Sequence, residues 1–248
     1  MILAKEIFTR YELKHVVDSK TYTQLLRALE PYTKKDAHGD KDGRYTISSL
    51  YYDTITDSFH HERMFGQNFR QKLRLRVYND TSLDGKAFLE IKKKHKKLVN
   101  KRRTLMKLGD VYDFVASRQA LGDDLPFEVS NPQILREIDF FKNLYRLEPR
   151  LIVSYERQAF QTINDEEIRI TFDSNLRNRR YDLRLEGGSY GETYLDPDFY
   201  VLEVKLMGRM PLWLTRILSE HRCGIQPFSK YSNSFYTDLM MAEKKKIL

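Results

Sequence analysis

Charged side chains recur at every second position in several short segments that are otherwise apolar. Arg74 and Arg76 alternate with leucine and valine, and Glu90 and Lys92 alternate with leucine and isoleucine. Successive side chains of a β-strand point to opposite faces, so each segment would carry its charges on one face. Like charges on one face repel unless an anion lies among them, and several such segments therefore indicate a site for a polyanion. The same alternation joins Glu12 with Lys14, Arg169 with Asp173, and Glu203 with Lys205.

The residue types indicate which anion is bound and leave two interpretations of the carboxylates open. Arginine makes bidentate contacts with phosphate, and lysine supplies point charges. Carboxylates among these cations suit a hard divalent metal that bridges protein and phosphate oxygens. Glu12, Glu90 and Glu203 each lie two residues from a lysine, so they can instead be ion-pair partners. On any single strand, a charged face is also typical of the solvated side of an antiparallel sheet.

The segments that carry these charges are predicted to be antiparallel strands. Turn signals such as Asn79-Asp80 and Asp84-Gly85 separate the segments in the first half of the chain. If the sheet closes, its charged faces line a tunnel and its apolar faces accept amphipathic helices. We therefore predict an α+β fold, an antiparallel β-barrel that forms a polar tunnel with flanking helices. The predicted strands are Phe8–Val17, Tyr45–Asp53, Gln71–Tyr78, Ala87–Lys94, Lys101–Lys107, Leu151–Gln161, Glu167–Asp173 and Tyr200–Met207.

Helix signals fill the gaps between these strands. Asp18-Ser19 is a capping sequence before an apolar-periodic segment that Pro31 ends, and Asn131-Pro132 opens a second such segment. The predicted helices carry Tyr22 to Leu29 and span Val111–Ala120, Gln133–Arg146, Pro211–Arg222 and Ser229–Lys245.

Composition is typical of a globular protein that attracts anions. The 248 residues fit one domain, with 41% hydrophobic and 12% aromatic residues. Lysine and arginine total 43 against 35 acidic residues, which gives a formal charge of +8. The only cysteine, Cys223, excludes an intramolecular disulfide and a cysteine-based zinc cluster. Residues 1–10 contain no apolar core long enough for a signal peptide, and no segment approaches about 18 uncharged apolar residues. We therefore expect a cytoplasmic protein whose membrane attachment, if any, comes from a partner.

The sequence resembles a known family, the VTC domain. This domain is the polyphosphate polymerase module of the vacuolar transporter chaperone complex, in the triphosphate tunnel metalloenzyme superfamily, which also contains the CYTH-type triphosphatases. Nine stretches carry the resemblance in the family's order and span nearly the whole chain. They are Tyr11–Lys14, Leu50–Asp53, Lys72–Arg76, Leu89–Lys92, Lys101–Arg103, Tyr155–Phe160, Ile168–Asp173, Val201–Lys205 and Ser229–Ser232.

The resemblance implies one VTC-like domain over residues 1–248, with a tunnel of about eight antiparallel strands. It implies that the γ-phosphate of ATP is transferred to a growing inorganic polyphosphate chain without a protein nucleophile, by positioning and charge neutralisation. Arg74, Arg76, Lys92 and Lys205 would act on the reacting phosphates, and Glu203, with Glu12 and Glu90, would hold Mn²⁺ or Mg²⁺. The implied phosphate-binding residues are Lys14, Arg74, Arg76, Lys92, Lys101, Arg103, Arg157, Arg169, Lys205 and Lys230.

One departure bears on the reaction, and three other functions stay open. The triphosphatase branch carries Glu-x-Glu-x-Lys near its N-terminus, but Arg10 occupies the first position here. This departure favours polymerase activity over hydrolysis of inorganic triphosphate or a nucleoside triphosphate. A non-catalytic domain that binds polyphosphate or nucleotide is the next alternative. Nucleic-acid binding is disfavoured because the basic residues alternate on strands and do not cluster with aromatics. Any coupling to transport is expected to need a separate membrane-protein partner.

The run Lys92–Lys97 is the densest cationic stretch of the chain. Two interpretations are open: the run guides a polyanion at the mouth of the tunnel, or it is a hairpin loop with solvated charges.

Overall fold

A computed structural model describes residues 7–96, 98–163, 168–226 and 228–235. The chain divides into two compact units, and each is described by itself. Unit 1 contains residues 1–9, 47–153 and 179–190, and unit 2 contains residues 10–46, 154–178 and 191–248.

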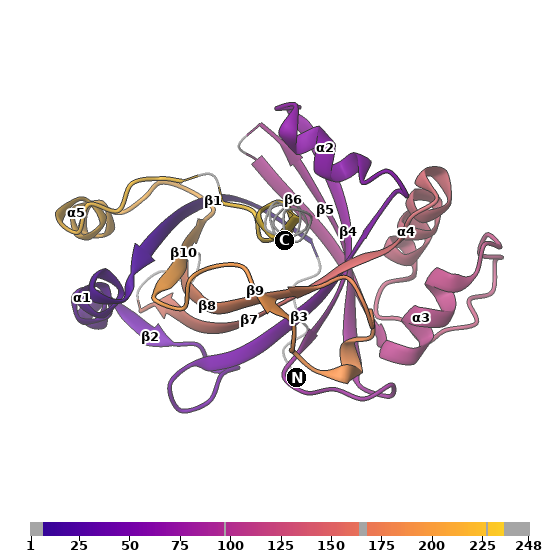
Figure 1. The fold of residues 1–248 in the computed structure, drawn as a ribbon, viewed down its shortest axis with the longest axis horizontal. Coiled ribbons are helices and arrows are strands. Elements are labelled where there is room, and N and C mark those ends of the chain that lie inside the picture. Colours follow the sequence, from indigo (N-terminus) through magenta and orange to yellow (C-terminus); the bar gives the residue numbers. More distant parts are fainter. Residues whose placement is uncertain (1–6, 97, 164–167, 227, 236–248) are drawn as a thin grey trace, which may run out of the picture. The chain divides into compact units, whose positions relative to one another are not determined.

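Unit 1 is built on four antiparallel strands that neighbour one another in sequence order (Figure 1). Asn79 adopts a left-handed backbone conformation (φ 55°) directly after β4, where the chain turns toward β5. In the register, Leu75 lies opposite Leu50 on one side and Leu89 on the other, so one face of the sheet is apolar. The strands are β3 (Arg44–Asp53), β4 (Phe69–Tyr78), β5 (Lys86–His95) and β6 (Leu98–Lys107).

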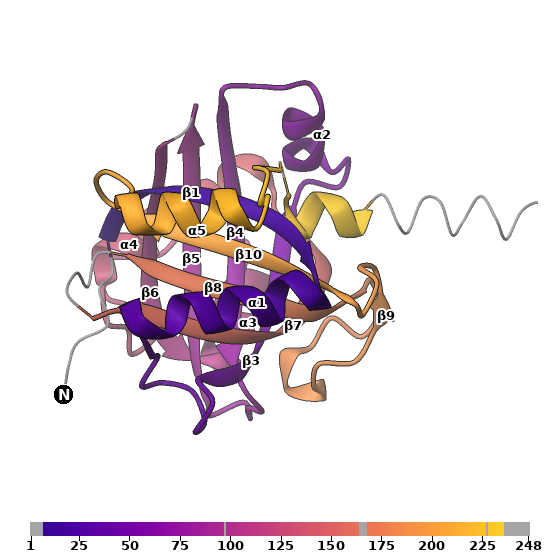
Figure 2. The same ribbon diagram turned by 90° about the vertical axis from the view of Figure 1, so that its left-hand side faces the viewer.

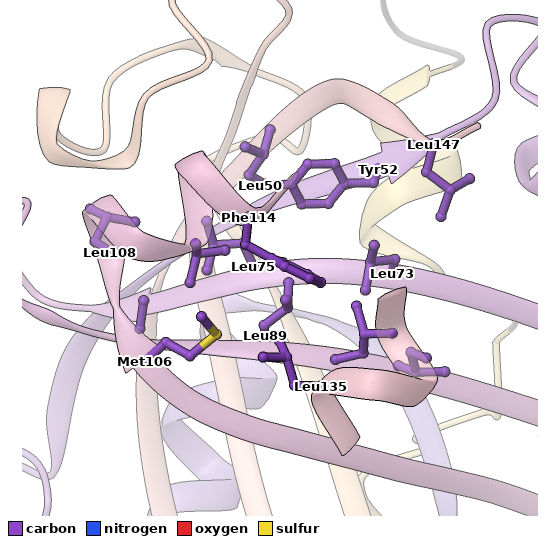
Figure 3. Packing of buried hydrophobic residues seen from close by; sticks show 14 of the residues in the cluster. Leu50, Tyr52, Leu73, Leu75, Leu89, Met106, Leu108, Phe114, Leu135 and Leu147 are labelled. Carbon is purple, nitrogen blue, oxygen red and sulfur yellow. The ribbon is translucent and has the colours of Figure 1, made fainter. Parts of the chain in front are cut away.

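Three helices cover the apolar face of this sheet. Leu73 and Leu89 from the strands pack in one buried cluster with Phe114 and Leu135 from the helices (Figure 3). Burying each such side chain stabilises the fold by roughly 1.5–3 kcal/mol. The helices are α2 (Ser58–Met64), α3 (Leu108–Ala116) and α4 (Pro132–Tyr145), and a short 3₁₀ turn, η2, spans Leu185–Gly187.

Capping residues fix where α2 and α4 begin. The Asp53 carboxylate at the end of β3 accepts hydrogen bonds from the backbone N–H groups of Phe59 and His60, at 2.9 and 3.1 Å. The Asn131 side chain accepts from the N–H of Ile134 at 3.1 Å, with proline at the next position. The apolar sides of both helices are therefore oriented onto the strands.

Unit 2 contains the remaining strands, again antiparallel. In one part β1, β10, β8 and β9 lie in that order, and in another β2 pairs with β7, which also pairs with β8. The strands are β1 (Ile7–Asp18), β2 (Thr33–Lys35), β7 (Glu148–Thr162), β8 (Arg169–Arg179), β9 (Glu192–Thr193) and β10 (Phe199–Leu206).

Two helices of unit 2 lie next to each other on one face of its strands (Figure 2). Leu25 of the first helix and Leu214 of the second pack in a buried cluster with Ile170, Phe172 and Val204 of the sheet. Asp18 caps the first helix, as predicted, by accepting from the N–H of Thr21 at 2.7 Å. The helices are α1 (Ser19–Leu29) and α5 (Leu212–Glu220), a 3₁₀ turn, η1, spans Glu30–Tyr32, and residues 230–235 are also helical.

Some predicted boundaries are wrong for local reasons. The helix predicted at Val111–Ala120 begins three residues earlier and ends at Ala116. The strand predicted from Lys101 begins at Leu98, and the first four residues of the Lys92–Lys97 run belong to β5, so most of that run is strand and not loop. The pairing of β5 with β6 extends both strands because its backbone hydrogen bonds do not depend on side-chain charge. Glu167 and the end of the last predicted helix, from residue 236, lie outside the described residues.

Candidate functional site

The first group of paired charges lies in unit 1 and is called the Glu90 cluster. Arg74 Nε donates to Glu90 Oε2 at 2.5 Å, and Lys101 Nζ donates to Glu90 Oε1 at 2.7 Å. An Arg103 guanidinium nitrogen lies 4.0 Å from the same Oε1 atom. The Glu90 side chain is 0% exposed, so its charge is compensated by these side chains and not by bulk water. The cluster consists of Arg74, Arg76, Glu90, Lys101 and Arg103.

The antiparallel register brings these residues together on the face opposite the helices. Arg74, Glu90 and Arg103 stand in one row across β4, β5 and β6. In the next row, Lys72 and Lys101 flank Lys92, so three lysines lie side by side. Like charges placed directly opposite each other destabilise a sheet unless an anion lies between them. Arg70 and Lys94 form the following row on the same face.

Electrostatics indicate a surplus of positive charge in the Glu90 cluster. Burial alone would raise the pKa of Glu90, but Arg74, Lys101 and Arg76 lower it well below its usual value, so the carboxylate is ionised at neutral pH. The pKa of Lys101 is lowered well below its usual value by burial, with three arginines adding to the effect and Glu90 opposing it. One carboxylate therefore does not neutralise the cations around it.

Two arginines of the Glu90 cluster also contact uncharged neighbours. Arg76 Nε donates to the hydroxyl of Ser49 on β3 at 3.1 Å. The Arg103 guanidinium lies 4.4 Å from the centre of the Phe88 ring, and its Nε atom has no hydrogen-bond partner among the described residues. Such contacts orient a guanidinium without neutralising it.

The other face of the same strands carries charges of a different kind. Lys93 Nζ donates to Glu137 Oε1 at 2.8 Å, and Arg102 lies 2.7 Å from Glu137 Oε2. Glu137 belongs to α4, so these two cations attach the helix to the sheet and are separated from the Glu90 cluster by the strand pleat.

The second group lies in unit 2 and is called the Glu203 cluster. Lys205 Nζ lies 2.8 Å from Glu203 Oε2, Arg157 lies 3.6 Å from the same atom, and Lys14 lies 3.4 Å from Oε1. Asp173 binds Arg157 in a bidentate pair at 2.6 and 2.8 Å and also pairs with Lys230. The cluster consists of Lys14, Arg157, Asp173, Glu203, Lys205 and Lys230.

Four strands of unit 2 position most of this cluster. Glu203 on β10 stands opposite Lys14 on β1 and Thr171 on β8, and Lys205 stands opposite Glu12 and Arg169. Arg157 lies on β7.

Burial and pairing keep both carboxylates of the Glu203 cluster ionised. Burial would raise the pKa of Glu203, but Lys205, Lys14, Lys230 and Arg157 lower it well below its usual value. Burial would also raise the pKa of Asp173, but Arg157 and Lys230 lower it below its usual value. Burial lowers the pKa of Lys230, although both carboxylates oppose that shift. Here two anions share four cations, a more even balance than around Glu90.

Arg169 is held at the side of unit 2 by a loop that sequence reasoning did not include. Its guanidinium pairs with Asp36 and donates to the Tyr45 hydroxyl at 2.8 Å. Burial would raise the pKa of Asp36, but Arg169 and the N–H of His38 lower it. The Arg169 Nε atom has no hydrogen-bond partner among the described residues.

Glu203 suits a divalent metal better than Glu90 does. Both Glu90 oxygens are hydrogen-bonded to cations, which matches the ion-pair interpretation. Glu203 Oε1 contacts Lys14 at 3.4 Å, longer than a charge-assisted hydrogen bond of about 2.7–2.9 Å. Mg²⁺ binds through one or two carboxylates plus waters and substrate phosphates, and Mn²⁺ also prefers oxygen ligands. The part of the chain that the structure describes contains no group of three or more His, Cys, Asp and Glu side chains placed to hold a metal. The protein would therefore supply few of the ligands.

The structure thus divides the predicted site residues into two sets, and their roles stay predictions. Sequence reasoning did not assign Asp173, Thr171 or Asp36 to the site. Asp173 and Thr171 share strand parity with Arg169, a signal that would have found them, whereas nothing in the sequence links Asp36 to Arg169. Unit 1 holds Arg74, Arg76, Glu90, Lys92, Lys101 and Arg103, and unit 2 holds Glu12, Lys14, Arg157, Arg169, Glu203, Lys205 and Lys230.

Comparison with known proteins identifies the family. The sequence pattern of the VTC domain matches residues 9–237. The chain belongs to the VTC domain family. The predicted resemblance is thereby confirmed, and the prediction of a single domain over residues 1–248 stays a prediction.

Two relatives are subunits of a larger assembly. The chain is 28% identical over 225 residues to vacuolar transporter chaperone complex subunit 4 of Trypanosoma brucei brucei (strain 927/4 GUTat10.1), covering 77% of this chain and 28% of that protein. It is 25% identical over 220 residues to the protein of that name from Trypanosoma cruzi (strain CL Brener), covering 75% and 27%. This VTC-domain chain thus spans less than a third of the length of either relative.

A solved structure shares the fold. The VTC-domain chain is similar to a putative adenylyl cyclase from Hippeastrum, described as revealing a dominant triphosphatase activity, with a TM-score of 0.50 and 15% identity over 92% of this chain and 94% of that one. At this identity the likeness concerns the fold alone. The predicted fold class, α+β with an antiparallel sheet of the triphosphate tunnel type and flanking helices, is confirmed. Within the described residues, no helix is long and apolar enough to cross a membrane.

Proposed function

We propose that this VTC-domain chain is a metal-dependent polyphosphate polymerase, which transfers the γ-phosphate of ATP to a growing chain of inorganic polyphosphate. One observation carries the proposal: four cations of the Glu90 cluster lie around its one buried carboxylate on the charged face of β4, β5 and β6. Glu90 is the carboxylate that pairs with Arg74, Lys101 and Arg103 there, and the next row consists of lysines. A chain of phosphates supplies the missing negative charge in a form that arginine binds in bidentate fashion.

The lowered pKa of Lys101 supports an anionic ligand rather than a permanently balanced structural network. Burial and neighbouring arginines disfavour its protonated form. A bound phosphate beside Lys101 would favour that form, so binding would raise the pKa of Lys101. A structural ion-pair network would gain nothing from retaining this surplus.

The Glu203 cluster supports the metal dependence. Glu203 is ionised and nearly buried, with a side chain that is 7% exposed. A divalent cation held there would neutralise charge on the phosphates during transfer. Lys14 and Lys205 lie against the same carboxylate, where they would orient and neutralise phosphate oxygens. Glu12 stands opposite Lys205, and its part in holding Mn²⁺ or Mg²⁺ is proposed on that position alone.

Direct transfer between phosphates agrees with the side chains available. Cys223 is a poor nucleophile because burial raises the pKa of its thiol. Phosphoryl transfer needs mainly positioning and charge stabilisation, which Arg74, Arg76, Lys92 and Lys205 would supply. The two trypanosome relatives are named as subunits of a vacuolar transporter chaperone complex, which supports a separate membrane-protein partner and attachment to a membrane through it.

The test is to incubate the pure chain with ATP and Mn²⁺ and to size the products by gel electrophoresis and phosphorus NMR. We expect long phosphate polymers, with one ADP released for each phosphate added. Glu203→Ala and Arg76→Ala should stay folded by circular dichroism and lose this activity. Lys35→Ala and Arg118→Ala remove cations from exposed ion pairs and should remain fully active.

The reaction product distinguishes the second candidate function, a triphosphatase, from the polymerase. The fold likeness to a protein described as having triphosphatase activity favours hydrolysis on the same scaffold. Release of ADP and orthophosphate without polymer would establish a triphosphatase and refute the polymerase. Retained affinity for polyphosphate without turnover under any metal would instead indicate a binding domain.

A further inference from the structure

Thr171 carries a buried hydroxyl for which the fold supplies no partner. The residue is 0% exposed, and its Oγ1 atom has no hydrogen-bond partner among the described residues. Buried hydroxyls are almost always hydrogen-bonded, because a buried hydroxyl without a partner loses its hydrogen bonds to water and makes none in the protein. An orphaned hydroxyl in the middle of a strand therefore points to a ligand.

The strand places this hydroxyl on the charged face of unit 2. Thr171 has the same parity on β8 as Arg169 and Asp173, whereas Ile170 and Phe172 lie on the other face, in the buried apolar cluster. In the pairing of β8 with β10, Thr171 stands directly opposite Glu203. The Cβ atoms of such pairs lie about 4.5–5.5 Å apart, so the hydroxyl and the carboxylate share one small volume.

One oxygen of Glu203 makes only a long contact and is available to bind a ligand there. Its Oε2 atom is engaged by Lys205 at 2.8 Å, but Oε1 contacts Lys14 at 3.4 Å. A carboxylate oxygen with a long contact and a neutral hydroxyl without a partner are two hard oxygen donors on neighbouring strands. Serine and threonine hydroxyls bind Mg²⁺ beside phosphates in the P-loop, where substrate and water complete the coordination.

We propose that the Thr171 hydroxyl is, with Glu203, a protein ligand of the divalent metal that accompanies the phosphates. This inference rests on the proposed function, because the metal is the one that the phosphates bring to the site. The cations Lys14, Arg157, Lys205 and Lys230 around Glu203 repel a bare metal. The ion therefore binds well only together with phosphate, and Thr171 contributes to that joint binding.

The test compares Thr171→Val with Thr171→Ser, which restores the hydroxyl. The probe is a non-hydrolysable imido analogue of ATP, titrated calorimetrically into the whole chain with and without Mn²⁺. We expect Thr171→Val to leave the affinity for the analogue unchanged in the absence of metal. The factor by which Mn²⁺ raises this affinity, called the Mn²⁺ enhancement, should fall about tenfold. Thr171→Ser should recover most of the enhancement. Because the measurement needs no turnover, it is independent of whether the chain makes polymer.

A stability measurement separates a metal ligand from a structural residue. Without metal or nucleotide, Thr171→Val should unfold in urea at the wild-type concentration or higher, because valine removes a polar group that nothing satisfies. A lower midpoint would show that the hydroxyl has a structural partner and would overturn the proposal. An unchanged Mn²⁺ enhancement would also overturn it, as would a loss of metal-free affinity, which would assign the hydroxyl to phosphate. If the chain makes no polymer but Thr171→Val loses the enhancement, the proposed function fails and the ligand assignment stands.

Discussion

The Glu90 cluster and the Glu203 cluster use the same residue types in different proportions. Glu90 is enclosed, with both oxygens hydrogen-bonded, and has more cations around it than it can neutralise. Glu203 shares its cations with Asp173 and keeps one oxygen at a long contact. From this difference we propose two tasks: the larger surplus around Glu90 would bind phosphate by charge alone, and the more evenly compensated cluster around Glu203 would bind phosphate with a metal.

The largest expected effect tests whether the two carboxylates differ in role. Glu90→Gln leaves Arg74, Lys101 and Arg103 without a buried counter-charge and should lower the free energy of unfolding by about 3–5 kcal/mol. Inorganic tripolyphosphate should restore much of this loss, because it replaces the missing anion. Urea unfolding with and without tripolyphosphate measures both quantities. Glu203→Gln should lose less stability and more activity, and the reverse order would refute the division of tasks.

The next effect concerns phosphate affinity without metal. Arg76→Met should weaken metal-free binding of tripolyphosphate by about 10- to 100-fold, as expected for a charged hydrogen bond of roughly 1.5–3 kcal/mol. Lys205→Met should weaken it less, because two carboxylates compensate part of the positive charge of its cluster. Calorimetric titration of both variants measures the difference. Lys93→Met, which removes a cation paired with Glu137 on the other strand face, is the control and should bind like the wild type.

The smallest effect is a graded loss of stability in acid. The pKa values of Glu90, Glu203 and Asp173 are lowered in the folded chain, so the unfolded chain binds more protons and stability rises with pH. The contribution is complete above the unfolded values of about 4.5 for Glu and 3.8 for Asp. It is lost as the pH falls through the lower folded values. Urea unfolding between pH 6 and 3 should show a shallower dependence for Glu90→Gln, and equal slopes would contradict the pairing of Glu90.

Strand parity predicted in advance which charged side chains lie together, while their roles in a site stay predictions. The alternation in β4, β5, β8 and β10 correctly predicted which side chains share a face, because a one-residue shift would expose the apolar cluster. Strand parity could not predict which carboxylate is better placed to bind a metal. Glu90 is saturated because two flanking strands both present cations to it, and that depends on a register that the sequence does not state.

Long-range pairing and short elements escaped prediction for other reasons. Asp36 meets Arg169 across 133 positions of chain, a distance over which no local pattern carries information. Helix α2 is seven residues long, too short for an apolar period to stand out. It forms because the Asp53 carboxylate binds its first N–H groups, an interaction that depends on where β3 ends.

The bridge from Glu137 to Lys93 and Arg102 links three elements of unit 1 through one side chain. The apolar alternation of β5 and β6 already excludes a one-residue slip of either strand, because such a slip would turn the apolar side chains away from the helices. Glu137 on α4 contacts one lysine of β5 and one arginine of β6. This set of ion pairs is complete only when the hairpin is paired and the helix is docked on it, so the bridge couples the docking of α4 to the pairing of the two strands.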